Sequence, residues 1–283
     1  MWVLDRSFRS QLCILAASCV LILPFASRNA RSEVVVSKEI LVENAGLRGM
    51  AAELLGRTGL GWDALNAFQV RCERMIQARN GDVAESWALS YRKPDKVRVE
   101  MLSPERRTIV VNGERLWEYL PARAAVACTD MSSLSEDRKA GYLAKVFSYV
   151  AVAGMRTGDV RYHIDAATNV NIMTKDSSVV RIYGHSPTYS VDIDTNTWVM
   201  VRYEMAAESG VLERMTVLRT EEVSPGVWCP MDVRQESMRG GNLVSMRTRI
   251  TILALGEGVK DSNFVFDTPP GVKEIRNTPS RRW

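Results

Sequence analysis

The chain has 283 residues, 46% of them hydrophobic, so it is long enough to bury a sizeable core. Its formal net charge is only +4. A nucleic-acid-binding surface needs clustered lysines and arginines and a strongly basic domain, so nucleic acid is excluded as an expected partner.

Residues 1–30 have the features of an export signal. Arg6 and Arg9 give a positive start, residues 12–25 are mostly apolar, and small residues follow as far as Ala30. The apolar stretch is shorter than the roughly 20 residues of a membrane-spanning helix. The sequence therefore predicts an exported protein; the family resemblance described below implies that its location is the periplasm of a Gram-negative-type envelope. An uncleaved, membrane-anchored form is the alternative.

The next segment predicts a helix followed by a long strand. Residues 33–55 begin irregularly and become helical, and three glycines between positions 56 and 61 end the helix. Residues 67–78 then alternate, with Phe68, Val70 and Cys72 on one face. An Asn-Gly pair at 80–81 turns this strand back toward the next one.

The stretch from Trp87 to Pro121 predicts a four-strand antiparallel meander. Pro94 and Pro104 mark two corners, because proline cannot donate a ladder hydrogen bond. Asn112-Gly113 is a hairpin signal, since both residues tolerate positive φ. Strict alternation gathers one apolar face of the first two strands. That face is expected to comprise Leu89, Tyr91, Val97, Val99 and Met101.

A short sixth strand, 124–129, precedes a second predicted helix. Ser133 and Glu136 have capping-box spacing, which predicts a helix over residues 133–153. Its apolar stripe is expected to be Leu143, Val146, Phe147 and Val150. Such a helix is either a movable lid over the opening of a curved sheet or an ordinary core-covering helix, and the sequence leaves both interpretations open.

From residue 161 onward the sequence reads as strands and turns. Strands are expected at 178–183, 189–194, 198–205, 211–223, 227–236 and 243–255. This regular spacing predicts one antiparallel sheet curled into a barrel or half-barrel. The basic tail 276–283 is expected to be loose.

The titratable residues do not form a recognisable catalytic or metal-binding motif. The two histidines, His163 and His185, lie in a strand-like run and a turn, and no HExxH, CxxC, GxSxG or phosphate-binding loop occurs. Asp192 and Asp194 share a strand face but lead into a turn, so we interpret them as structural. We expect no enzyme activity, no catalytic residue, no metal and no cofactor.

Three cysteines follow the predicted signal, Cys72, Cys128 and Cys229. Their spacing matches no zinc or redox motif. We expect free thiols buried as small hydrophobic side chains, and one disulfide among the three is the alternative.

Two segments carry a family resemblance. Leu116, Trp117, Tyr119 and Pro121 follow a Leu-Trp-x-Tyr-x-Pro pattern, and residues 263–272 read NFVFDTPPGV. In this order, from about Ala51 to Ile275, the chain resembles the LolA-like group of periplasmic lipoprotein carriers, whose relatives include RseB and the mycobacterial LppX type. The resemblance implies a mainly β (α+β) fold, with a curved antiparallel sheet forming one open half-barrel over residues 31–275. An N-terminal helix and a central lid helix would cover it.

The resemblance also implies a function. The apolar strand face and the stripe of the second helix would line a cavity for a lipid or lipoprotein acyl chain, although sequence alone cannot separate cavity lining from core. Lys93 stands where carriers such as enterobacterial LolA have an arginine that ties the lid closed, but lysine lacks the planar fork of arginine. The implied role is non-enzymatic transport of a lipid or acylated lipoprotein for outer-membrane trafficking, with an inner- or outer-membrane partner protein. The alternative is an RseB-like envelope sensor or interaction module without transport.

Overall fold

The computed structural model describes residues 38–58, 60–79, 81–149, 169–175, 178–185, 188–207, 210–239 and 241–277. The predicted signal segment, His163 and most of the predicted loose tail lie outside these ranges. Within them the chain is mainly β. The strands are β1 (Ala67–Ala78), β2 (Gly81–Arg92), β3 (Lys96–Ser103), β4 (Arg107–Asn112), β5 (Arg115–Leu120), β6 (Ala125–Asp130), β7 (Asn169–Thr174), β8 (Val179–His185), β9 (Thr188–Asp194), β10 (Val199–Ala207), β11 (Gly210–Ser224), β12 (Val227–Arg239), β13 (Asn242–Leu255) and β14 (Lys273–Asn277).

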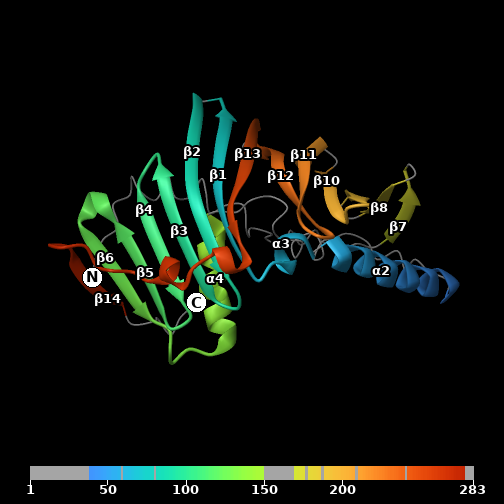
Figure 1. Ribbon diagram of the computed structural model, residues 1–283. Helices are drawn as coiled ribbons and strands as arrows, with labels where there is room; N and C mark the ends of the chain where they lie inside the picture. Colours follow the sequence, from blue (N-terminus) through green and yellow to red (C-terminus); the bar gives the residue numbers. More distant parts are fainter. Residues whose placement is uncertain are drawn as a thin grey trace, which may run out of the picture.

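All of these strands belong to one curved sheet (Figure 1). Their order across the sheet is β14-β6-β5-β4-β3-β2-β1-β13-β12-β11-β10-β9-β8-β7. Neighbouring strands are antiparallel. The exception is β14, which pairs in parallel with β6. The predicted half-barrel and the four-strand meander β2–β5 are confirmed.

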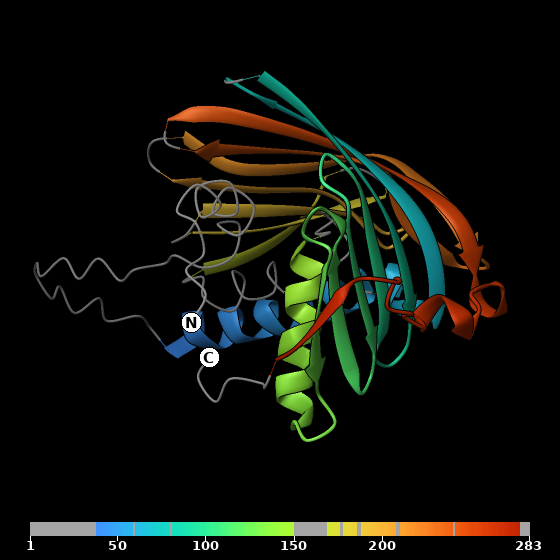
Figure 2. The same cartoon turned by 90° about the vertical axis from the view of Figure 1, so that its left-hand side faces the viewer.

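Two longer helices lie on the concave side of the sheet (Figure 2). They are α2 (Lys38–Thr58) and α4 (Glu136–Tyr149), and the short helix α3 (Leu60–Ala64) follows α2. We call this side the inner face and the opposite side the outer face. The N-terminal and central helices that the sequence predicts are thus both present over the sheet.

The predicted start of the central helix is wrong. The central helix begins at Glu136, where Ser135 O accepts hydrogen bonds from the backbone N–H groups of Arg138 and Lys139, so the Ser133 capping box does not start it. Glu136 instead forms an ion pair with Lys139 at 2.9 Å. Backbone pairing of β14 with β6 continues to Asn277, and the predicted domain end at residue 275 stays a prediction.

The inner face holds two apolar clusters. One lies on β1–β4, β12 and β13 and includes Val146 of α4. The other lies on β7–β12 and includes Ala51 and Leu55 of α2. Met231 and Val233 are two residues apart on β12 and belong to different clusters, so both clusters share one face of the sheet.

A C-terminal strap, residues 256–272, crosses the outer face of β3–β5. It contains two short 3₁₀ helices, η2 (Gly256–Gly258) and η3 (Asp261–Phe264). Arg98 of β3 donates to the backbone oxygens of Asn263 and Val265 at 3.3 and 3.1 Å. The ring of Phe266 lies 6.1 Å from Trp117 and 6.2 Å from Tyr119. The strap therefore covers the two aromatic side chains that β5 turns outward.

Replacing Phe266 tests this packing. Phe266→Ala removes both ring contacts, and we expect the free energy of unfolding to fall by about 1–2 kcal/mol. Val265→Ala is the matched control, because Val265 is 55% exposed and its loss is expected to change stability by less than about 0.5 kcal/mol. Urea unfolding measures both variants, and equal losses would contradict the assigned role of Phe266.

Candidate functional site

An apolar floor covers the inner face beneath α4. It is made of buried side chains from β1–β4, β12 and β13. They are Val70, Cys72, Trp87, Leu89, Val97, Val99, Ile109, Val111, Cys229, Met231 and Ile250. Because these strands pair in continuous register, alternate residues of each strand stand side by side on one face.

The five strand residues expected to line a cavity lie on this face. Tyr91 pairs with Val97 and Leu89 with Val99, and Met101 lies opposite the floor residue Trp87. Leu89, Val97 and Val99 are fully buried in the floor, while Tyr91 and Met101 are partly buried against it. The shared face is confirmed, and a role in holding a ligand stays a prediction.

The helix α4 brings part of its expected stripe to the floor. Val146 is 2% exposed and belongs to the same cluster, and Leu143 and Tyr142 pack against that cluster while remaining partly exposed. The side chain of Phe147 and the whole of Val150 lie outside the described part of the chain. The described contacts are thus consistent with both a lid and a core-covering helix.

Lys93 sits at the corner between β2 and β3, at the end of the floor. Its backbone N–H donates to Asn66 O at 2.8 Å, which fixes the corner to the loop before β1. Its side chain is exposed. The latch role that the family resemblance implies for Lys93 stays a prediction.

Sequence reasoning missed an aromatic group at the same end of the floor. The ring of Trp62, from α3, lies 5.0 Å from Phe68, and Phe68 lies 5.4 Å from Tyr91. Helix α3 approaches β12 closely here, because a Cβ added at Gly61 would stand 2.9 Å from Trp228 O. In the sequence, Gly61 is the one residue that indicates this close approach, because glycine has no Cβ.

Sequence reasoning also missed a polar row that borders the floor. The inner face also carries Arg74, Glu85 and Thr248. They lie two residues along their strands from Cys72, Trp87 and Ile250, respectively. Arg74 Nη1 lies 3.4 Å from Glu85 Oε2, and Arg74 Nε donates to Thr248 Oγ1 at 3.3 Å. The three residues are only 6–8% exposed. The signal was available, because Arg74 and Cys72 have the same parity along β1.

The order of these elements is a helix, a long first strand, a meander, a second helix over the concavity, and a run of hairpins completing one sheet. This order of elements agrees with the open half-barrel that the sequence predicts. No protein-family model matches the sequence, and no curated protein matches it either.

Several solved structures are similar to the chain. A LolA superfamily protein from Nitrosomonas europaea is 13% identical and covers 75% of this chain and 98% of its own, with a TM-score of 0.42. A DUF1329 family protein from Desulfovibrio piger is 14% identical, with coverages of 78% and 97% and a TM-score of 0.46. A putative outer membrane lipoprotein-sorting protein domain from Vibrio parahaemolyticus is 13% identical, with coverages of 77% and 95% and a TM-score of 0.44. At such identities the likeness concerns the fold alone.

The three described thiols of the sheet are free, as expected. Cys72 and Cys229 are buried in the floor, and burial raises the pKa of each to about 12. Cys128, on β6, is partly exposed, and burial followed by the charge of Glu274 raises its pKa. The two floor thiols are therefore neutral and act as small apolar side chains.

Site-resolved alkylation tests this difference. We expect iodoacetamide at pH 8 to label Cys128 in the native protein and to label Cys72 and Cys229 only in denaturant, because alkylation needs an accessible thiolate. Peptide mass spectrometry measures the labelled fraction at each cysteine. Native labelling of Cys72 at the rate of Cys128 would show that the floor is open to water.

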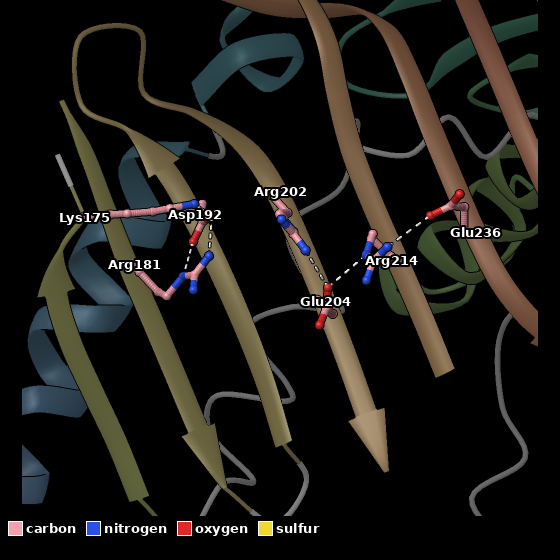
Figure 3. A network of polar contacts seen from close by, with 7 residues as sticks. All are labelled: Lys175, Arg181, Asp192, Arg202, Glu204, Arg214 and Glu236. Carbon is pink, nitrogen blue, oxygen red and sulfur yellow. Dashed lines mark hydrogen bonds and ion pairs between the residues drawn. The ribbon is translucent and has the colours of Figure 1, made fainter. Parts of the chain in front are cut away.

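The outer face of β8–β12 carries a charged network (Figure 3). Arg181 binds Asp192 through two hydrogen bonds of 2.6 and 2.8 Å, and Lys175 adds a third at 3.2 Å. The remaining members form a second chain of ion pairs. These are Arg202, Glu204, Arg214 and Glu236. A cavity of about 270 Å³ adjoins Arg181 and Glu204 at β7–β10, but both residues are already held within the network.

Asp192 has a structural role, as expected, although a different one from Asp194. Asp194 accepts from the backbone N–H of Asn196 at 2.9 Å and caps the turn. Asp192 is 3% exposed; its burial raises the pKa, but the hydrogen bonds from Arg181 and Lys175 outweigh burial and lower it. A lowered pKa in the folded state means that the ionised carboxylate stabilises the fold above the unfolded pKa of about 4, and that this contribution is lost as the pH falls.

Substitution of Asp192 tests this contribution. At pH 7, Asp192→Asn is expected to lower the free energy of unfolding by about 1–3 kcal/mol, and the difference from wild type should shrink as the pH falls below about 4. Glu236→Gln is the control, because its 3.6 Å contact with Arg214 is partly exposed and is expected to contribute less than about 1 kcal/mol. A pH-independent difference for Asp192→Asn would contradict the charge-based explanation.

Within the described residues, no group of three or more His, Cys, Asp or Glu side chains is arranged to hold a metal ion. Among the same residues, no helix is both long and apolar enough to span a membrane.

Proposed function

We propose that this protein is a non-enzymatic periplasmic carrier that holds the acyl chain of a lipid or lipoprotein between the apolar floor and α4. The observation that supports it is the convergence of two separate segments. Leu89, Val97 and Val99 of the meander and Leu143 and Val146 of α4 meet in one apolar cluster on the concave side of the sheet. The binding unit would be the single half-barrel domain, with Lys93 at its rim.

The energetics of an inserted chain favour this arrangement. Both α4 and the floor present apolar side chains. An acyl chain inserted between them would replace the contact of α4 with the floor by two apolar contacts, one to each, and would leave no apolar surface exposed to water. Each buried methylene contributes about 0.8 kcal/mol, so a chain of fifteen carbons could contribute on the order of 10 kcal/mol before ordering costs. No polar group of the protein would need to change its partners along the floor.

The composition of α4 suits a helix that can move. Glu136 and Lys139 form an ion pair with each other within the helix, so displacement of α4 would leave this pair intact. Gly141 lies in its middle and lowers helix stability by about 1 kcal/mol relative to alanine. We infer that α4 is the lid, and that trafficking toward the outer membrane involves loading and release by partner proteins in the envelope.

A charge placed on the lid tests the carrier proposal. Leu143→Glu puts a carboxylate against the floor, and we expect the protein purified from a bacterial periplasm to retain at least tenfold less lipid. Gly141→Glu adds the same charge to the same helix, but Gly141 is exposed and no atom lies within 4 Å of an added Cβ. Native mass spectrometry with lipid extraction measures bound lipid in both variants.

The outcomes separate the two candidate functions. Bound phospholipid or acylated peptide in the wild type and Gly141→Glu, but not in Leu143→Glu, would support the carrier. A wild-type protein that carries no lipid and resists loading with fatty acid would overturn the carrier proposal. Stable recovery of a membrane-tethered partner protein under those conditions would favour the RseB-like sensor instead.

A further inference from the structure

The cavity of about 270 Å³ at β7–β10 opens on the outer face, on the opposite side of the sheet from the apolar floor. Across three strands of its lining, Tyr183 pairs with Ser190 and Ser190 with Glu204. Along each strand these residues alternate with members of the inner-face cluster, so their side chains point outward. Ser190 and Ala206 are short, and the longer side chains around them leave a hollow in the surface of the sheet.

Two side chains of opposite charge line the cavity, and each keeps one polar atom unused. Arg181 donates to Asp192 through Nε and Nη2. Glu204 accepts hydrogen bonds through Oε2 alone, from Arg202 and Arg214. Among the residues that the structure describes, none contacts Arg181 Nη1 or Glu204 Oε1 by a hydrogen bond or ion pair. The network therefore fixes both side chains (Figure 3) and leaves one donor group and one acceptor atom for a further partner.

Both groups carry their charges at neutral pH. The hydrogen bond from Arg202 lowers the pKa of Glu204, although burial acts in the opposite direction. The hydrogen bond to Asp192 raises the pKa of Arg181, and the charge of Glu204 adds to this increase. The backbones of β8 and β10 are about 10 Å apart, because β9 lies between them. A small molecule above Ser190 can therefore contact the cation and the anion together.

The rest of the lining limits the size and the polarity of such a molecule. The cavity volume of about 270 Å³ lies just below the range of about 300–1,000 Å³ that is usual for ligand pockets, so the ligand must be small. Met173, Tyr183 and Ala206 give the cavity apolar walls, and Ser190 contributes a hydroxyl group. This lining fits a ligand that has an apolar part beside its polar groups.

We propose that this cavity binds a small zwitterion with an apolar side chain, of the class of a free α-amino acid, with Arg181 Nη1 donating to its carboxylate and Glu204 Oε1 accepting from its ammonium group. A ligand with a carboxylate alone would be repelled by Glu204, and one with an ammonium group alone would be repelled by Arg181. The site goes beyond the proposed carrier function, because the sheet separates it from the floor.

Three probes with the same isobutyl group test the proposal. L-Leucine carries both charges, 3-methylbutylamine carries only the ammonium group, and 4-methylpentanoate carries only the carboxylate. We expect the wild type to bind L-leucine at least tenfold more tightly than either of the other two, because each charge-assisted hydrogen bond contributes to affinity. Isothermal titration calorimetry on the full chain measures the three affinities.

Substitution of Glu204 separates the two charged contacts. Glu204→Gln should weaken the binding of L-leucine and of 3-methylbutylamine about tenfold, and it should leave 4-methylpentanoate unchanged or bound more tightly. Glu236→Gln is the matched control, because Glu236 belongs to the same network through its 3.6 Å contact with Arg214 but does not line the cavity. It should leave the affinities for all three probes unchanged.

A second variant keeps the test independent of the ion pairs. Ala206→Leu fills the cavity without removing a charge, and it should weaken L-leucine binding at least tenfold. The inference would be overturned if the wild type bound L-leucine no more tightly than the singly charged probes, if it bound none of them, or if Glu236→Gln had the same effect as Glu204→Gln. The lipid content of the same preparations tests the carrier function separately, so failure of one proposal is distinguishable from failure of the other.

Discussion

The pairing of β1 with β13 is the constraint on which the rest of the structure depends. Strand β1 pairs with β2 over its whole length, and on its other edge it pairs with β13 from Phe68 opposite Leu255 to Gln77 opposite Ser245. The first contact is local in sequence, but the second joins segments from opposite ends of the chain. Without it, the strands from β14 to β1 and those from β13 to β7 would be two separate sheets, each with an open edge. The floor spans this junction, since Cys72 stands between Trp87 and Ile250.

The two faces of the sheet use different interactions. On the outer face the charges are mutually satisfied, as in the bidentate pair of Arg181 and Asp192, and the C-terminal strap covers the aromatic side chains of β5. On the inner face the apolar clusters are covered by helices, which contact the sheet through side chains rather than through a backbone ladder. Helix-to-sheet packing can therefore change while the sheet keeps its register.

Local pattern was sufficient to predict much of the fold and the direction of the candidate site residues. Alternation placed Leu89, Val97 and Val99 on one face because a period of two holds in any regular strand, whatever the tertiary structure. The strand β1 was found with its observed bounds for the same reason. The pairing of β1 with β13, in contrast, has no local signal. Regular strand spacing predicted one curled sheet, but it did not show which distant strands would meet.

The elements that sequence reasoning missed are those with little hydrophobic signal. The residues of β14 are all exposed, so only backbone pairing with β6 defines the strand. In β7, Val170 is the one fully buried side chain, which is too few to produce an alternating pattern. Helix α4 begins later than the capping box predicted. Its first turn carries Glu136 and Asp137, whose negative charges favour a helix N-terminus at this point.

Sequence reasoning missed Arg74, although the alternation of β1 places it on the inner face. A charged side chain in a strand is normally assigned to the solvent side, yet the parity of β1 puts Arg74 beyond Cys72 on the apolar face. Its burial lowers its pKa, and Glu85 acts in the opposite direction by favouring the charged form. The burial of Arg74 among apolar neighbours therefore follows from strand parity, although the polarity of its side chain points the other way.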